Sequence, residues 1–379
     1  MKKITVYYIK EEEHDMSNLK EIIIKYIKKT YEYSYRENGE YCRFLNKKEI
    51  DFDNIEKDLG FSLHQSIKDY FYEVKFSNKN QLAQATGISK TTCTTLIKEL
   101  MEEGFLKQTE NNESTGGRPS KGYELNKDFY HVCLIMIQNG QLPKIQFEIK
   151  NLWGESIEKY EEEVKGSCIE HLQKNLSKLI SEDAKISYIA LSIPGVINAK
   201  DDILSCDIWE FENKNMHDIL DQYEIPFIIE NDVNLAVVGY HTIEESVVFL
   251  YQPGSMYSGC GIMLDHQLYR GSTLFAGEVG YLNGCAFVEP EDFDVAQMTI
   301  IEQLTALICV LNPQKIVIQS SYDLEKQKLI NALEANIQKI HIPEIEMTSD
   351  IELYISKGLM EAAVDLERDH MKVKEIKKL

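Results

Sequence analysis

The sequence predicts an α/β protein that begins with a winged helix-turn-helix and continues as a larger region of alternating strands and helices. Two observations carry the prediction. Between residues 62 and 103, apolar residues recur at helical spacing and a glycine turn separates two short helices. From residue 130 onward, short apolar runs alternate with amphipathic stretches, which is typical of sheets covered by helices. A chain of 379 residues is long enough for two or three domains with their own cores.

The expected helix-turn-helix module spans residues 62–125. Its first helix places apolar residues at helical spacing up to Val74, and its second, residues 81–87, ends at a glycine that is a natural C-cap. Ser89 is a good N-cap for a third helix that runs to about Glu103. Two short strands separated by a polar, turn-rich loop complete the module. The apolar face of the third helix is formed by Cys93, Leu96, Ile97 and Leu100.

The outer face of the third helix carries hydroxyl and ammonium groups, which suit hydrogen bonds to phosphates and base edges in a DNA major groove. The loop of residues 114–121 would be the wing, with Arg118 entering a narrow minor groove and Lys121 meeting a phosphate. The alternative is a small helical domain that contacts only other proteins. The expected DNA-binding residues are Ser89, Lys90, Thr91, Thr92, Thr94, Thr95, Lys98, Gly117, Arg118 and Lys121.

The net charge of −21 is unevenly distributed along the chain. Residues 1–75 carry 14 Lys and Arg against 15 Asp and Glu, and residues 76–125 carry 6 of each. The remaining 21 basic and 41 acidic residues lie in 126–379, which therefore has a net charge of −20. Acidic bulk repels DNA, so contact with a duplex has to come from the neutral segment.

Six strands and three helices are expected in the large C-terminal region. The strands are residues 131–137, 186–193, 227–229, 247–251, 261–264 and 315–319. The helices are residues 169–181, 235–242 and 295–311.

The eight cysteines and the hydropathy pattern predict neither a metal site nor a membrane span. No Cys-x-x-Cys pair occurs, so we expect mostly buried thiols in a reducing compartment. Three glutamates follow the first apolar run, which argues against a signal peptide, and no run of about 18 apolar residues is evident. We therefore expect a cytoplasmic protein.

The helix-turn-helix segments resemble the N-terminal domain of ROK-family repressors, a family named after repressors, open reading frames and kinases. The resemblance is carried by residues 82–92, 100–106 and 114–119, and it continues to the C-terminus. It implies relatives among xylose and N-acetylglucosamine repressors. It also implies an actin-like ATPase fold, with lobes at 126–245 and 246–356 and the terminal helix, residues 357–379, rejoining the first lobe. Residues 1–61 would be an extension of unknown role.

Four further segments resemble the family's sugar-kinase domain: residues 189–195, 230–236, 269–280 and 311–318. Carboxylates and an amide at strand ends give a polyol both acceptors and donors. In kinases of the family, the residue that matches Asp232 is the general base. The alternative role for Asp232 is a stabilising carboxylate at a helix N-terminus. The expected ligand-binding residues are Gly195, Asn231, Asp232, Glu278 and Tyr281.

Three departures from the family pattern argue against phosphoryl transfer. The family's Asp-x-Gly phosphate motif is replaced by Gln138-Asn139-Gly140, which has no carboxylate to organise magnesium. The family's zinc-binding cysteines are missing, since only Cys285 lies near. At the position where the family pattern has a histidine, this chain has Tyr281. The sequence therefore predicts no cofactor and no metal.

The leading hypothesis is a repressor of carbohydrate-utilisation genes that binds double-stranded operator DNA as a homodimer or higher homo-oligomer and senses a sugar or sugar derivative. Because the metal and zinc features of the family are missing, the kinase-like domain could instead sense a partner protein or a phosphorylated compound, or bind no ligand at all. The second hypothesis is an ATP-dependent hexose kinase with an appended DNA-binding domain. The third is a regulator that works through protein contacts of its first 60 residues.

Overall fold

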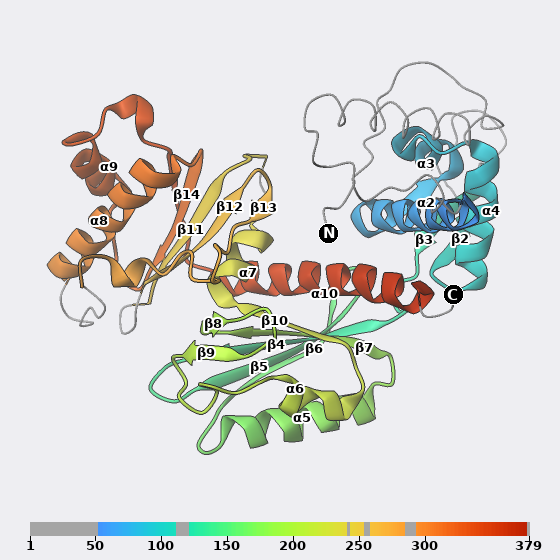
Figure 1. Cartoon of the computed structure of the whole chain (residues 1–379), viewed down its shortest axis with the longest axis horizontal. Helices are drawn as coiled ribbons and strands as arrows, with labels where there is room; N and C mark the ends of the chain where they lie inside the picture. The colour runs from blue at the N-terminus through green and yellow to red at the C-terminus, as the bar shows by residue number, and fades with distance from the viewer. Residues whose placement is uncertain (1–51, 111–120, 241–242, 254–257, 285–292, 377–379) are drawn as a thin grey trace. The chain divides into compact units, whose positions relative to one another are not determined.

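The computed structural model describes residues 52–110, 121–240, 243–253, 258–284 and 293–376 (Figure 1). The chain divides into two compact units, Met1–Leu125 and Asn126–Leu379, and each is treated by itself. The first unit is a helical module with a small sheet, and the second contains two five-stranded sheets.

The described part of the first unit, residues 52–110 and 121–125, has three helices and a three-stranded antiparallel sheet of order β1-β3-β2. The first helix begins at Phe52, ten residues before the expected start of the module at residue 62. Apolar Ile55, Leu59 and Leu63 continue its four-residue spacing in the sequence. The strand β1 was not predicted. The elements are α2 (Phe52–Val74), β1 (Phe76–Asn78), α3 (Lys79–Thr86), α4 (Lys90–Glu102), β2 (Leu106–Glu110) and β3 (Lys121–Leu125).

Side-chain caps set the tight turn between α3 and α4. The Asn78 side chain accepts from the backbone N–H groups of Asn80 and Gln81, and the Gln81 side chain accepts from the Asn78 N–H, which forms a capping box. Gly87 ends α3 in the left-handed region at φ 72°, as predicted. Ser89 Oγ accepts from the Thr92 N–H at 3.2 Å and starts α4. The predicted apolar face of α4 is confirmed, because Cys93, Leu96, Ile97 and Leu100 are all buried.

The first sheet of the second unit has the order β10-β7-β4-β5-β6. Strands β4, β7 and β10 are parallel, whereas β4, β5 and β6 form an antiparallel meander. Figure 1 shows α5 on one face of this sheet and α10 on the other. The elements are β4 (His131–Gln138), β5 (Lys144–Asn151), β6 (Ser156–Glu163), α5 (Cys168–Glu182), β7 (Ile186–Ile193), β8 (Gly195–Ile197), β9 (Ile203–Cys206), α6 (His217–Leu220), β10 (Phe227–Asn231), α7 (Asp232–Gly239) and α10 (Ile351–Ile376).

The second sheet has the order β13-β12-β11-β14-β15 and is covered by α8 and α9 (Figure 1). Strands β11, β14 and β15 are parallel, and β12 and β13 extend the edge in antiparallel fashion. The elements are β11 (Val247–Gln252), β12 (Gly259–Leu264), β13 (Gln267–Leu268), α8 (Phe293–Leu311), β14 (Lys315–Ser320), α9 (Lys326–Glu334) and β15 (Glu344–Met347). All six strands predicted after residue 126 form.

Within the described ranges one helix, α8, is long and apolar enough to cross a membrane by length and composition alone. A helix was predicted at residues 295–311, but no apolar run of membrane-spanning length was expected there. Its inner face, which includes Ile300, Leu304 and Leu307, is buried in the core of the second sheet. Helices of a protein core meet the same length and composition criteria.

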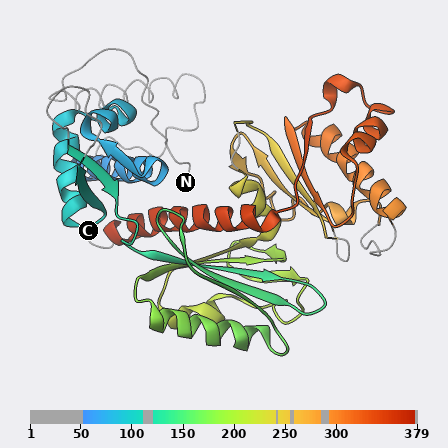
Figure 2. The same cartoon turned by 180° about the vertical axis from the view of Figure 1, so that it is seen from behind.

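Helices α7 and α10 cross at two glycines, and Figures 1 and 2 both show α10 running beside α7 and over the first sheet. A Cβ atom on Gly239 would lie 2.0 Å from the carbonyl oxygen of Tyr354, and one on Gly358 would lie 2.1 Å from that of Leu235. The absence of side chains therefore lets the two backbones touch. The start of α7 lies at the cleft described below, so this crossing fixes the helix that carries Asp232.

Gly358→Ala is expected to lower the free energy of unfolding by about 1–3 kcal/mol, because the added methyl group would overlap backbone atoms of α7. Helix propensity acts in the opposite direction and favours alanine by about 1 kcal/mol. Urea unfolding followed by tryptophan fluorescence measures the effect, since Trp153 and Trp209 both belong to the second unit. Leu353→Ala, at an exposed position of the same helix, is the control. A Gly358→Ala protein as stable as the control would contradict the close crossing.

Candidate functional site

The structure separates the predicted DNA-binding residues of α4 into an exposed set and a capping pair. Ser89 and Thr92 are half-buried and bind each other through their hydroxyl oxygens at 2.9 Å, so they hold the start of the helix. The outward face is then left to five exposed side chains. They are Lys90, Thr91, Thr94, Thr95 and Lys98.

Two of these exposed side chains also make contacts within the helix. Thr94 Oγ1 donates to the Lys90 carbonyl at 2.7 Å, and Lys98 Nζ lies 3.4 Å from Glu102. Lys121 is exposed at the start of β3. Gly117 and Arg118 lie outside the described residues, so their role in a wing stays a prediction.

A cleft of about 760 Å³ lies in the second unit and is lined by both of its sheets. It brings together all five residues that the sequence singled out for ligand binding. Three further features of the cleft were not foreseen: a third carboxylate, an ion pair between the two sheets, and the contacts of Asn231. The predicted residues in the lining are Gly195, Asn231, Asp232, Glu278 and Tyr281.

Asn231 uses its side chain to build the site. It caps α7 by accepting from the Val233 and Asn234 N–H groups at 2.9 and 3.0 Å, and its amide donates to the Gly195 carbonyl at 3.1 Å. This cap starts α7 at Asp232, whereas the sequence analysis placed its start at Leu235 and its end at Thr242. Asn231 therefore positions Asp232 and the β8–β9 hairpin, and both of its side-chain polar atoms are engaged.

Gly195 is required by the same hairpin. A Cβ atom there would lie 2.4 Å from the Ser205 carbonyl oxygen, so β8 and β9 could not approach as they do. Gly195 is thus a backbone position at the cleft wall, and no side chain can replace it without moving β9.

Among the carboxyl groups of the cleft, those of Asp207, Asp232 and Glu278 do not ionise independently. Burial, together with the negative charges of Asp207 and Glu278, raises the pKa of Asp232 to about 7. Burial also raises the pKa of Glu278, with Asp207 adding to the effect. The Asp207 residue is exposed to solvent as a whole. Neighbouring protein atoms still remove enough water from its carboxyl group to raise the pKa to about 6. Nothing in the sequence around Asp207 pointed to the cleft.

An ion pair links the two sheets at the cleft. Arg270 follows β13, and its Nε and Nη2 atoms lie 2.8 and 2.6 Å from one oxygen of Glu230 at the end of β10. The other Glu230 oxygen accepts from the Asn231 N–H and from the Asn234 amide. Both Arg270 and Glu230 stood in segments that resembled the family, but the sequence gave no reason to pair them.

No group of three or more His, Cys, Asp or Glu side chains in the described ranges is arranged to hold a metal ion. Gln138 at the end of β4 and Asn139 after it line the cleft wall, and neither carries a carboxylate.

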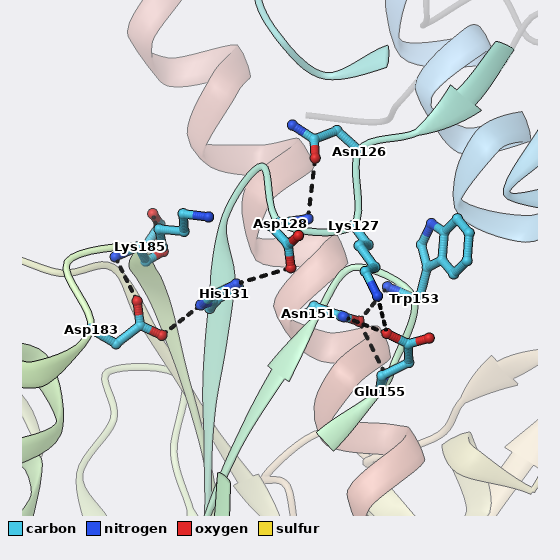
Figure 3. Close-up of polar contacts among 10 residues, drawn as sticks. Asn126, Lys127, Asp128, His131, Asn151, Trp153, Glu155, Asp183 and Lys185 are labelled. Carbon is cyan, nitrogen blue, oxygen red and sulfur yellow. Dashed lines mark hydrogen bonds and ion pairs between the residues drawn. The ribbon is translucent and has the colours of Figure 1, made fainter. Parts of the chain in front are cut away.

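Polar contacts fix the first residues of the second unit to its sheet (Figure 3). Lys127 Nζ lies 2.9 Å from Glu155 and 5.7 Å from the Trp153 ring centroid. His131 lies between two carboxylates, 2.5 Å from Asp183 and 3.7 Å from Asp128. The segment that follows the helix-turn-helix unit in the chain is therefore held rigidly at the start of β4.

The fold and the two sites define a class of protein: a winged helix-turn-helix unit followed by a two-sheet α/β unit with a polar cleft. Residues 77–107 match the model of a winged helix-turn-helix DNA-binding domain, and residues 144–290 match that of the ROK family. The chain therefore combines a segment that matches a winged helix-turn-helix DNA-binding model with a later segment that is similar to the ROK family.

Curated relatives include repressors and kinases. A xylose repressor of Caldicellulosiruptor bescii is 28% identical over 221 residues, which cover 55% of each chain. A xylose repressor of Bacillus subtilis is 23% identical over 54% of this chain and 56% of its own. A beta-glucoside kinase of Listeria monocytogenes is 29% identical over 41% of this chain and 54% of its own. This chain thus spans about half the length of the curated relatives it matches.

Among solved structures, a ROK family transcriptional regulator described as a homologue of the E. coli MLC protein is similar to this chain. It has a TM-score of 0.64 and 15% identity, over 84% of this chain and 99% of its own. At this identity the likeness shows the fold, which agrees with the predicted combination of a winged helix-turn-helix and a ROK kinase-like domain.

Proposed function

We propose that this protein is a DNA-binding transcriptional repressor of carbohydrate-utilisation genes, and that its ROK domain senses a sugar or a related polyol without phosphorylating it. The observation that carries the proposal is the outward face of α4, where five hydroxyl or ammonium side chains stand opposite a buried apolar face. The xylose repressors among the relatives support it. A cytoplasmic location and a homodimer that reads a symmetric operator belong to the same proposal.

The sensing step couples the cleft to the helix-turn-helix unit through β4. This strand begins at His131, where the polar contacts of Figure 3 anchor the incoming chain, and ends at Gln138 in the cleft wall. A ligand that changes the position of the cleft walls acts on one end of β4 while the DNA-binding unit is joined to the other. The size of the response is limited by the ligand's difference in affinity between the two states.

The test has two stages. Bound sites are first selected from random duplex DNA with the full-length protein, and a panel of sugars is then tested for release of the selected site. Sequence-specific binding that a sugar weakens is the expected result. A protein that binds no duplex at low salt, where phosphate contacts are strongest, would overturn the proposal.

A kinase remains the second candidate because Asp232 is retained and its raised pKa suits a general base. The cleft lining opposes it, since Gln138 and Asn139 cannot bind magnesium as a carboxylate does. A coupled assay of ADP release with several hexoses distinguishes the two. Turnover that Asp232→Asn abolishes would favour the kinase.

Arg118→Ala is expected to weaken operator binding by about 1–3 kcal/mol. The substitution removes a positive charge that a narrow minor groove, with its strongly negative potential, would attract. Titration of labelled operator at fixed salt measures the change. Lys326→Ala, in the second unit, removes the same charge and is the control. An unaltered dissociation constant for Arg118→Ala would reject the minor-groove role.

A further inference from the structure

Two exposed aromatic rings stand together at the edge of the cleft. The centroids of Phe275 and Tyr281 are 5.3 Å apart and their planes are inclined by 60°. Tyr281 lines the cleft with 60% of its surface exposed, and Phe275 beside it is 46% exposed. Removal of apolar ring surface from water is favourable, so a ligand that covers the exposed parts of these two neighbouring rings gains affinity.

The backbone beneath the rings is rigid. Gly277 has φ 102°, and a Cβ atom there would lie 1.9 Å from the Cys260 carbonyl oxygen. The Cys260 N–H donates to the Gly277 carbonyl, and the Gly280 N–H donates to the Ser258 carbonyl, both at 2.8 Å. The segment that carries Phe275, Glu278 and Tyr281 is thus fixed against β12. A preformed aromatic surface loses little entropy when a ligand covers it.

The charge of the cleft decides which kind of ligand fits. The described lining has only two basic side chains, and both are engaged: Lys144 by Glu161 at 3.2 Å and Arg270 by Glu230 at 2.6 Å. An anionic ligand such as a nucleotide or sugar phosphate would meet uncompensated negative charge. The acidic residues of the lining are Asp201, Asp207, Glu212, Glu230, Asp232, Glu278 and Glu352.

We propose that Phe275 and Tyr281 form a second subsite, and that the cleft binds a neutral two-ring glycoside, either a disaccharide or an aryl glycoside. Its first sugar ring contacts Asp232 and Glu278, and its second ring covers the two aromatic side chains. A cleft of about 760 Å³ lies within the range of about 300–1,000 Å³ that is typical of small-molecule sites. This inference rests on the proposed function only in taking the cleft as the effector site.

Isothermal titration of the full-length protein with matched pairs of ligands tests the subsite: glucose against cellobiose and phenyl β-glucoside, and xylose against xylobiose. We expect at least one two-ring ligand to bind ten times more tightly than its one-ring counterpart or better. Phe275→Ala and Tyr281→Ala should reduce that ratio to about one, and Tyr281→Phe, which keeps the ring, should preserve it. Ile340→Ala, at a side chain that is 84% exposed elsewhere, is the control and should preserve it too.

Other outcomes would overturn the subsite. Equal affinity for every matched pair would show that the rings contribute nothing, as would a lack of binding by all the two-ring probes. Binding of AMP or ATP that Phe275→Ala removes would assign the rings to a nucleotide base. Thermal unfolding of each variant separates these results from misfolding. Failure of the proposed function is distinguishable, because it appears as loss of DNA binding in a protein that still binds glycosides.

Discussion

Thr91→Glu is expected to lower operator affinity at least a hundredfold while leaving the protein folded. Thr91 is exposed and stands two residues after the cap of α4, in the part of a recognition helix that meets base edges. A carboxylate there faces the phosphates of both strands and replaces a small hydroxyl that lets the helix approach closely. Such a loss corresponds to about 2.7 kcal/mol or more.

The same substitution stabilises the helix itself, so its effect on operator binding can be distinguished from any effect on folding. A negative charge in the first turn of a helix stabilises it by about 0.3–1 kcal/mol. The thermal midpoint of Thr91→Glu should therefore equal or exceed that of the unmodified protein. Gln338→Glu adds the same charge at an exposed position of the second unit and serves as the control in a titration of labelled operator. Operator affinity within threefold of the control would remove α4 from the DNA interface.

Elements whose burial follows a simple pattern were predictable from the sequence. The strands β4, β7, β11 and β14 are continuous apolar runs because parallel strands are covered on both faces. The inner face of α4 was equally readable, because its four buried side chains recur at three- and four-residue spacing. For these elements a local pattern determines which side chains face the core.

The errors arose where a distant contact or a cap sets the structure. The start of α7 depends on Asn231, whose side chain accepts from two backbone groups of the helix. The pairing of Arg270 with Glu230 joins residues 40 positions apart, and the place of Asp207 depends on how the chain returns after β9. Gly239 and Gly358 gave no periodic signal, although both are needed where α7 meets α10. Such contacts are properties of the tertiary structure and leave no mark at fixed spacing.

Asp232→Asn is expected to stabilise the protein at pH 8 and to abolish its response to the ligand. The pKa of Asp232 is about 7 in the folded protein, against about 3.9 in an unfolded chain. Between these values the folded state binds more protons, so the stability contributed by this group falls as pH rises and is lost above about pH 7. At pH 8 the charged carboxylate opposes folding. Asparagine removes this destabilisation, but it also removes a negative charge that is favourable at the start of α7. The expected net increase in the free energy of unfolding is about 1–2 kcal/mol.

Loss of the ligand response has a different origin. A carboxylate that accepts from sugar hydroxyls contributes about 1.5–3 kcal/mol through charge-assisted hydrogen bonds, and the amide supplies only one acceptor in its place. We therefore expect at least a tenfold loss of ligand affinity in Asp232→Asn, with operator affinity unchanged, which gives a repressor that the ligand cannot release. The two effects have opposite signs, so simple damage to the fold cannot produce both.

Thermal unfolding between pH 4 and pH 8, together with operator titration in the presence of ligand, measures the two effects. Asp265→Asn is the matched control, because it removes the same charge from an exposed turn outside the cleft, where φ is 51° and asparagine fits well. The unmodified protein should lose stability relative to Asp232→Asn as pH rises from about 4 to 7, whereas the control should follow the unmodified protein. If Asp232→Asn keeps the same pH dependence and still releases DNA with ligand, Asp232 is only a helix N-terminal carboxylate and the sensing site lies elsewhere.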